Sequence, residues 1–168
     1  MAQDEGIFGR ISRIMRSWAP PGLRPLVPRK LVREYTNAYS AVCPSKGILV
    51  SLILPYSNTD MMHLFLNHLS EELKDFFIVM QVDRATWHTS ESLEIPENIR
   101  LIYQPAKSPE LNPAEHIWEE IREKYFANEI FDTLEEVIDL LSRALNELAD
   151  QADKIRSLTF FPHFNITF

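Results

Sequence analysis

Phe77-Ile78-Val79-Met80-Gln81-Val82-Asp83 is the stretch of sequence that decides the fold class. A nearly continuous apolar run of this length predicts a strand that is covered on both faces. The preceding residues 60–74 carry apolar side chains at helical spacing, and Asn58 or Thr59 is placed to cap that helix. A helix that leads directly into a covered strand predicts an α/β protein. Asp83 then lies at the carboxyl end of a central strand, where open α/β sheets bind ligands.

On both sides of this stretch the chain shows further strand and helix patterns. The Arg- and Pro-rich residues 10–30 predict a loop or hairpin. The other predicted elements are strands at 32–42, 48–54 and 100–103 and helices at 113–128 and from Thr133 onward. Three strands with short connections at the front fit an antiparallel meander, and the strands after the first helix fit parallel additions. This order predicts a ribonuclease-H-like α/β fold over residues 1–168, a single domain with a mixed five-stranded sheet flanked by helices.

Composition limits the class of protein. The chain has 168 residues and an apolar share of 45%, values typical of one globular domain. No apolar run approaches the roughly 20 residues of a membrane span, and the single Cys43 excludes an internal disulfide framework. The first residues also lack the basic and apolar segments of a signal peptide, so we expect a cytoplasmic protein without membrane contact.

The net charge of −7 is unevenly distributed along the chain. Residues 1–46 carry eight Lys or Arg and three Asp or Glu, whereas residues 47–168 carry nine Lys or Arg and 21 Asp or Glu. A basic N-terminal part can meet phosphates while the acidic remainder faces water, and a solvated Arg-rich loop explains the charge equally well. On the first interpretation the candidate nucleic-acid contacts in this part are Arg10, Arg13 and Arg16.

Three acids stand where predicted elements begin or end. Asp4 lies in or at the end of a short extended segment, Asp83 ends a strand, and Glu115 lies in the first turn of a helix. Each also has an ordinary structural explanation: chain-end polarity for Asp4, a turn or cap for Asp83, and the helix dipole for Glu115. Glu119, one turn along the same helix face, is the alternative third acid.

Three converging carboxylates would suit Mg²⁺ or Mn²⁺, because hard cations prefer oxygen ligands. Two such ions can flank a phosphodiester, one activating the attacking water or hydroxyl and the other stabilising the departing oxygen. A zinc site is not expected, because His88 and His116 lack close His or Cys companions in the sequence.

Two longer stretches carry a family resemblance. They are Asp83-Arg-Ala-Thr-Trp-His-Thr-Ser90 and Tyr103-Gln-Pro-Ala-Lys-Ser-Pro-Glu-Leu-Asn-Pro-Ala-Glu-His-Ile-Trp118. Together with Gln3-Asp4-Glu5 and the later Trp18, they resemble mariner-type transposases, most closely the bacterial insertion-sequence branch of that superfamily. The pattern Ser-Pro-Glu-Leu-Asn-Pro-x-Glu-x-x-Trp is highly specific, and the resemblance covers nearly the whole chain.

This resemblance implies a DDE catalytic domain in which Asp4, Asp83 and Glu115 bind two Mg²⁺ (or Mn²⁺) ions. It also implies metal-dependent phosphodiester cleavage at transposon ends and strand transfer into target DNA. The expected partners are therefore DNA and a second copy of the chain, because two transposon ends must be held together. His88 matches a position that the family usually fills with His, so it is expected beside the active site and in reach of DNA. Trp118 is expected to pack rather than to act.

The sequence departs from the family pattern in three places. Arg84 replaces the Asn common after the second aspartate, and it joins Lys107 as a candidate DNA contact. Thirty-one residues separate Asp83 from Glu115, slightly fewer than is usual in the family. The chain starts three residues before Asp4, so we expect a shortened first strand and no N-terminal helix-turn-helix domain to read DNA ends.

Because the chain starts so close to Asp4, we also consider alternatives to an enzyme that is active without a further part. The chain could work with a separate DNA-binding half, or it could be an inactive interaction or dimerisation fragment of a split or decayed transposase. A different ribonuclease-H-like nuclease, such as a Holliday-junction resolvase, would keep the metal site and change the substrate. The loop Ser108-Pro-Glu-Leu-Asn-Pro113 argues against that last reading.

Overall fold

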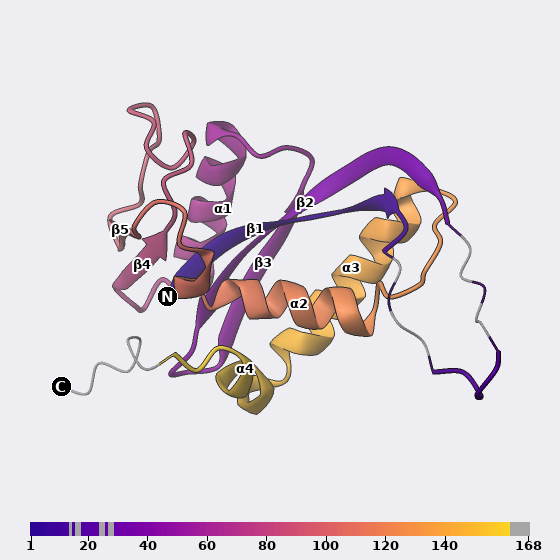
Figure 1. Cartoon of the computed structure of the whole chain (residues 1–168). Helices are drawn as coiled ribbons and strands as arrows, with labels where there is room; N and C mark the ends of the chain where they lie inside the picture. Colours follow the sequence, from indigo (N-terminus) through magenta and orange to yellow (C-terminus); the bar gives the residue numbers. More distant parts are fainter. Residues whose placement is uncertain (14, 16–17, 24–25, 27–28, 162–168) are drawn as a thin grey trace.

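A mixed five-stranded sheet forms the centre of the molecule, whose computed structural model describes residues 1–13, 15, 18–23, 26 and 29–161. The strands, in the order β3-β2-β1-β4-β5, are β1 (Ala2–Ile11), β2 (Leu31–Cys43), β3 (Ile48–Leu54), β4 (Ile78–Val82) and β5 (Ile99–Tyr103). β1, β2 and β3 pair antiparallel, whereas β4 runs parallel to β1 and β5 runs parallel to β4 (Figure 1). The predicted mixed sheet flanked by helices, in the strand order of a ribonuclease-H-like fold, is confirmed.

Helices cover both faces of this sheet. They are α1 (Thr59–Glu72), the short 3₁₀ helix η1 (Pro109–Leu111), α2 (Ala114–Lys124), α3 (Leu134–Ala149) and α4 (Ala152–Leu158). α1 packs with Tyr39 and Ala41 of β2, whereas α2, α3 and α4 pack on the opposite face with Ala38 and Val42. Because successive side chains of a strand point to opposite faces, β2 contributes to both cores.

The first strand differs from its prediction. We expected a short extended segment around Asp4 and a loop or hairpin from residue 10, but β1 runs to Ile11, so Asp4 is the third residue of a ten-residue strand. Nearly all of β1 pairs with the long β2, and this cross-strand pairing overrides the weak strand preference of Gly6 and Gly9. The acid is therefore held inside a regular ladder.

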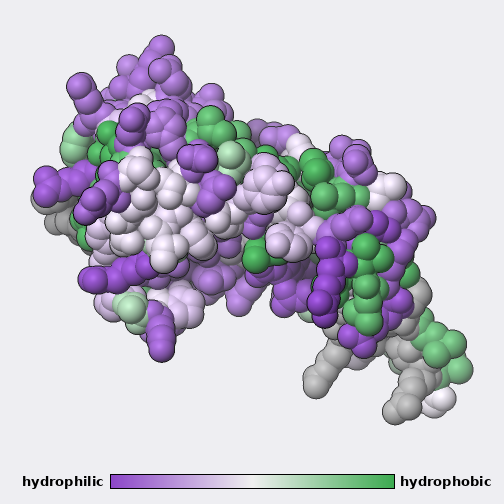
Figure 2. All heavy atoms as spheres, turned by 90° about the horizontal axis from the view of Figure 1, so that it is seen from above, coloured by the Kyte–Doolittle hydropathy of each residue, from purple (hydrophilic) through white to green (hydrophobic). Residues whose placement is uncertain are grey.

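Between β1 and β2, the described residues 18–23 project from the body of the molecule (Figure 1). Leu23 and Leu26 are 68% and 95% exposed there, and apolar side chains are visible at this end of the molecule in Figure 2. No helix in the described part of the chain is long and apolar enough to cross a membrane.

The register between β1 and β4 sets the position of the site. Ala2 is aligned with Gln81 across the parallel pair, and the backbone N–H of Gln81 donates to the carbonyl of Met1 at 2.8 Å. Two residues further along both strands, Asp4 and Asp83 reach the same level of the sheet. β4 ends at that level while β1 continues, which opens space beside Asp4 for the start of α2.

Candidate active site

The three predicted acids line one pocket. Asp4 from β1, Asp83 from the end of β4 and Glu115 from the first turn of α2 surround a cavity of about 320 Å³. Other residues of its wall are Arg84, Gln104, Lys107, Ser108 and Asn112. The fold therefore gathers at one edge of the sheet three acids of which the first and last are 111 residues apart along the chain.

Trp118 holds Asp4 in place. Its indole Nε1 donates a hydrogen bond to Asp4 Oδ2 at 3.1 Å, and the ring is only 1% exposed. The ring can reach the strand because Gly6 lies beneath it: a Cβ at Gly6 would stand 2.8 Å from Trp118 Cδ2, closer than real contacts allow. Trp118 does pack, as predicted, and it also fixes an acid of the pocket, which the sequence prediction missed.

Asp83 is held by a buried histidine behind it. His88 Nδ1 lies 2.7 Å from Asp83 Oδ1, and His88 Nε2 lies 2.9 Å from Glu5 Oε1. His88 is 2% exposed, and Glu5 also accepts hydrogen bonds from Gln3 Nε2 and Trp87 Nε1. Since a carboxylate can only accept, both ring nitrogens donate when the imidazole is protonated. Burial alone would lower the pKa of His88, but the hydrogen bonds and charges of Glu5 and Asp83 outweigh it and raise that pKa.

This arrangement leaves part of the Asp83 carboxylate available. The backbone N–H of Ala85 also donates to Asp83 Oδ1, at 2.9 Å. Within the described chain no hydrogen bond falls on Oδ2 of Asp83, so that oxygen can serve a ligand in the pocket.

Asn112 joins the Pro-rich loop to β1 and so places the helix that carries Glu115. Its Nδ2 donates to the carbonyl of Gln3 at 2.9 Å, and its Oδ1 accepts from the N–H of Ala114 at 3.1 Å. Gln81 of β4 supports the same loop by donating to the carbonyl of Leu111 at 3.1 Å. The first turn of α2 is therefore tied to the two strands that carry the aspartates.

The electrostatics of the pocket favour a bound cation. Burial first, and then the charges of Glu115 and Glu5, raise the pKa of Asp4 to about 7. Carboxylates pressed together in this way are relieved by a hard cation, whose preferred ligands are carboxylate oxygens. As placed, however, no three His, Cys, Asp or Glu side chains among the described residues are close enough to hold one ion. The donor chemistry fits Mg²⁺ or Mn²⁺, and closure around an ion requires the side chains to move inward.

The six predicted nucleic-acid contacts have different surroundings. Arg84 and Lys107 line the pocket and are exposed, and Arg84 Nε donates to the carbonyl of Gln104 at 3.3 Å. Lys107 has a φ of 59°, a strained conformation for a residue with a side chain, and such residues cluster at functional sites. His88 is buried behind Asp83 rather than open to solvent.

Arg10 is neutralised by an ion pair with Glu34 at 2.5 Å, whereas Arg13 lines a second pocket with Arg122. Arg16 lies outside the described residues. The alternative acid Glu119 is exposed and does not line the site, so the structure gives it no role there.

Known proteins resemble this chain in sequence and in fold. The model of the family described as DDE superfamily endonuclease matches residues 1–138. The uncharacterized protein y4pE/y4sA of Sinorhizobium fredii (strain NBRC 101917 / NGR234) is 37% identical over 121 residues, which cover 71% of this chain and 90% of that protein.

Solved structures of the Mos1 transposase share the fold. The paired-end complex with left transposon end has a TM-score of 0.62 and 16% identity, and the match covers 95% of this chain and 55% of that one. The Mos1 Strand Transfer Complex has a TM-score of 0.62 and 19% identity, and the match covers 95% of this chain and 54% of that one. The Mos1 mariner paired end complex with Mn has a TM-score of 0.62 and 17% identity, and the match covers 95% of this chain and 55% of that one. The chain thus spans about half the length of these solved proteins. The predicted resemblance is confirmed: the chain matches the DDE superfamily endonuclease family and shares its fold with the mariner transposase structures.

Proposed function

The chain belongs to the DDE superfamily endonuclease family, and on this premise we propose that it is the catalytic domain of a DNA transposase. The proposed reaction is divalent-metal-dependent cleavage of phosphodiester bonds at transposon ends, followed by transfer of the freed strand into target DNA. The observation that supports it best is the meeting of Asp4, Asp83 and Glu115, from three separate elements, in one open pocket.

In this proposal the three carboxylates would hold Mg²⁺ or Mn²⁺. When bound, the ions supply activation of the attacking water or hydroxyl and stabilisation of the departing oxygen. Two observations support this assignment. Oδ2 of Asp83 accepts no hydrogen bond from the described residues, and the negative charges of Glu115 and Glu5 act on Asp4. Carboxylate, carbonyl and water oxygens are the ligands that these cations prefer.

The surrounding residues have positioning roles in the same proposal. Trp118 holds Asp4 and the Glu5–His88 pair holds Asp83, so that each carboxylate keeps its orientation when a charged substrate enters. Arg84 and Lys107 place positive charge on the pocket wall, where a phosphate of the scissile strand would lie.

The joining reaction requires two transposon ends in one assembly. We therefore expect a homodimer on DNA, and the recognition of end sequences to come from a separate DNA-binding part. Light scattering of the protein with and without DNA measures the first expectation directly.

The test of the catalytic proposal is nicking of supercoiled plasmid in the presence of Mn²⁺. We expect nicking by the wild type and none by Asp83→Ala or Glu115→Gln. Glu119→Gln is the matched control, because Glu119 lies on the same helix outside the pocket and should keep full activity. Equal nicking by all four proteins would refute the assignment of the site. A folded wild type that neither binds Mn²⁺ nor nicks DNA would instead identify the chain as an interaction module.

A further inference from the structure

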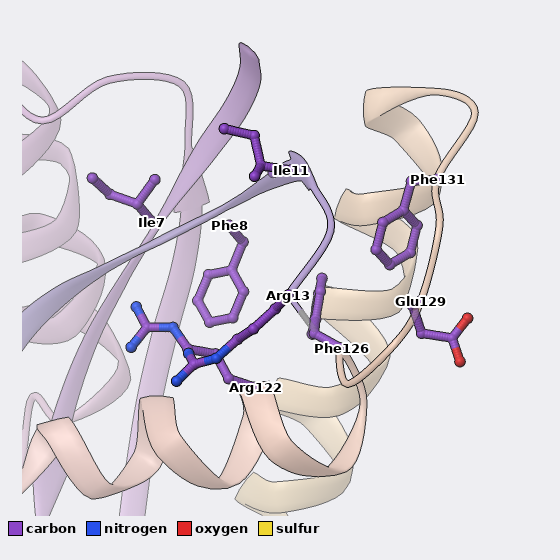
Figure 3. Close-up of a pocket in the computed structure, with 9 residues that line it drawn as sticks. Ile7, Phe8, Ile11, Arg13, Arg122, Phe126, Glu129 and Phe131 are labelled. Atoms are coloured by element: carbon purple, nitrogen blue, oxygen red, sulfur yellow. The ribbon is translucent and has the colours of Figure 1, made fainter. Parts of the chain in front are cut away.

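A second pocket lies on the same face of the sheet as α2, further along β1 from the acids. It has a volume of about 170 Å³, and Figure 3 shows Arg13 and Arg122 converging beneath the ring of Phe8. Phe126 and Phe131 form the aromatic side of this pocket. Two guanidinium groups next to an aromatic surface are an arrangement that suits an anionic ligand.

The backbone around Arg13 is fixed rather than free. Asn128 N–H donates to the carbonyl of Arg13 at 3.1 Å, and Asn128 Oδ1 accepts from the N–H of Met15 at 3.0 Å. These bonds, together with a parallel bridge between Arg13 and Ala127, dock the residues after β1 onto the loop after α2. Arg13 is therefore held beside Arg122 by contacts between segments more than 100 residues apart.

Arg122 is held from the other side by packing. Its guanidinium carbon lies 5.3 Å from the centre of the Phe8 ring, within the range of a cation–π contact. Burial first, and then the charge of Arg13, lower the pKa of Arg122, and they outweigh the charges of Glu115, Asp4 and Glu119, which raise it. An anion between the two arginines would remove their repulsion.

Among the described residues, the two guanidinium groups have charged neighbours but no direct ion-pair partner. In the part of the chain that the structure describes, neither guanidinium forms an ion pair with a carboxylate, in contrast to Arg10 and Arg156. Glu129 also lines the pocket, but Figure 3 shows its carboxylate pointing away from the two arginines. The fold thus holds two neighbouring cations without a direct ion pair among the described residues, while the carboxylates of Glu115, Asp4 and Glu119 act on Arg122 from further away.

We propose that Arg13 and Arg122 together bind one phosphate of the DNA backbone, on the strand that leads away from the active site. The inference rests on the proposed function, which supplies DNA as the ligand. Glu115 and Arg122 are seven residues apart on α2, which places them on the same face of the helix and about 10 Å apart along it. At about 3.4 Å per nucleotide of one strand, the phosphate would lie roughly three nucleotides from the scissile bond.

The test is the binding of a fluorescent 20-base-pair duplex, measured by anisotropy between about 50 and 200 mM salt in a metal-free buffer. Each phosphate contact contributes about 0.9 to the slope of log K against log salt. We expect Arg13→Gln and Arg122→Met each to reduce the slope by up to about 0.9 and to weaken binding several-fold. Arg122→Met keeps an apolar stem over Phe8, and its melting temperature checks the fold.

The double variant and a control make the test specific. Two residues that share one phosphate should not act independently, so the double variant should bind only slightly more weakly than either single variant. Arg143→Gln, at an exposed position on α3, removes the same charge elsewhere and should leave the slope unchanged. The inference is overturned if the single variants match Arg143→Gln, if their effects simply multiply, or if the wild type does not bind the duplex.

Plasmid nicking by the same proteins separates this inference from the catalytic proposal. Normal Mn²⁺-dependent nicking with no effect of the arginines on binding would overturn the phosphate site alone. An arginine effect on binding without any nicking would leave the phosphate site standing and remove the proposed catalysis.

Discussion

Replacement of Asp4 by Asn should stabilise the metal-free protein at alkaline pH. In the folded chain, burial and the charges of Glu115 and Glu5 raise the pKa of Asp4 from 3.8 to about 7. A carboxyl that binds its proton more tightly in the folded state makes the free energy of unfolding fall as pH rises between these two values. The wild type should therefore lose stability from about pH 4 to about pH 7, and Asp4→Asn should avoid that loss.

The size of the effect follows from the shift. About three pKa units at about 1.4 kcal/mol each set an upper limit of about 4 kcal/mol. The hydrogen bond from Trp118 can be kept by the amide oxygen of Asn, so little should be lost in exchange. For a chain of this size, a gain of 2–4 kcal/mol corresponds to a rise in melting temperature of about 4–16 °C at pH 8.

The assay is thermal unfolding in EDTA from pH 4 to pH 8. His88 also has a raised pKa, and its contribution is lost as pH rises above about 6.5, so Asp4→Asn should keep a weaker slope in that range. Asp139→Asn, on the exposed face of α3, is the control and should follow the wild type. Parallel curves for wild type and Asp4→Asn would refute the reasoning. With Mn²⁺ in place of EDTA, only the wild type should gain stability, because ligand binding to the folded state stabilises it.

Two further predictions concern the supports of the site. Gly6→Ala should lower stability by about 1–3 kcal/mol in denaturant unfolding, because its Cβ would stand 2.8 Å from the ring of Trp118; an unchanged midpoint would contradict the close approach. His88→Asn should weaken Mn²⁺ binding by about 10- to 100-fold in calorimetric titration, since it removes the group that orients Asp83. A folded His88→Asn protein with wild-type Mn²⁺ affinity would show that the histidine has no positioning role.

Much of the fold could be predicted because its signals are local. The continuous apolar run at 48–54 gave both ends of β3, and the polar residue Asn58 does accept the hydrogen bond that caps α1. β1 was underestimated, since Gly6 and Gly9 weaken any strand pattern and only pairing with β2 extends it. α4 was not predicted, because seven residues are too few to show a clear helical period.

The positions of the three acids in the fold could be predicted, and the resemblance also placed His88 near them, whereas the contacts that support the acids could not be predicted. Asp83 and Glu115 stand at the end of a strand and the start of a helix, positions that the sequence makes visible. The bond between His88 and Glu5 joins residues 83 apart, and no periodicity reveals it. The position of Trp118 in the helical pattern predicts a core residue. The same position fits a residue that also donates a hydrogen bond to Asp4, so the sequence pattern does not reveal the second role.

The hydrogen bond from Asn112 Nδ2 to the carbonyl of Gln3 affects when the site can form during protein synthesis. It joins residues 109 apart, so β1 has no anchored loop beside it until Asn112 has been synthesised. At about 5–20 residues per second, β1 waits on the ribosome for roughly 5–20 seconds before the pocket can close. A growing chain that stops before α2 would therefore carry the aspartates without the helix that supplies Glu115, and the pocket would gain its third acid only after α2 has been synthesised.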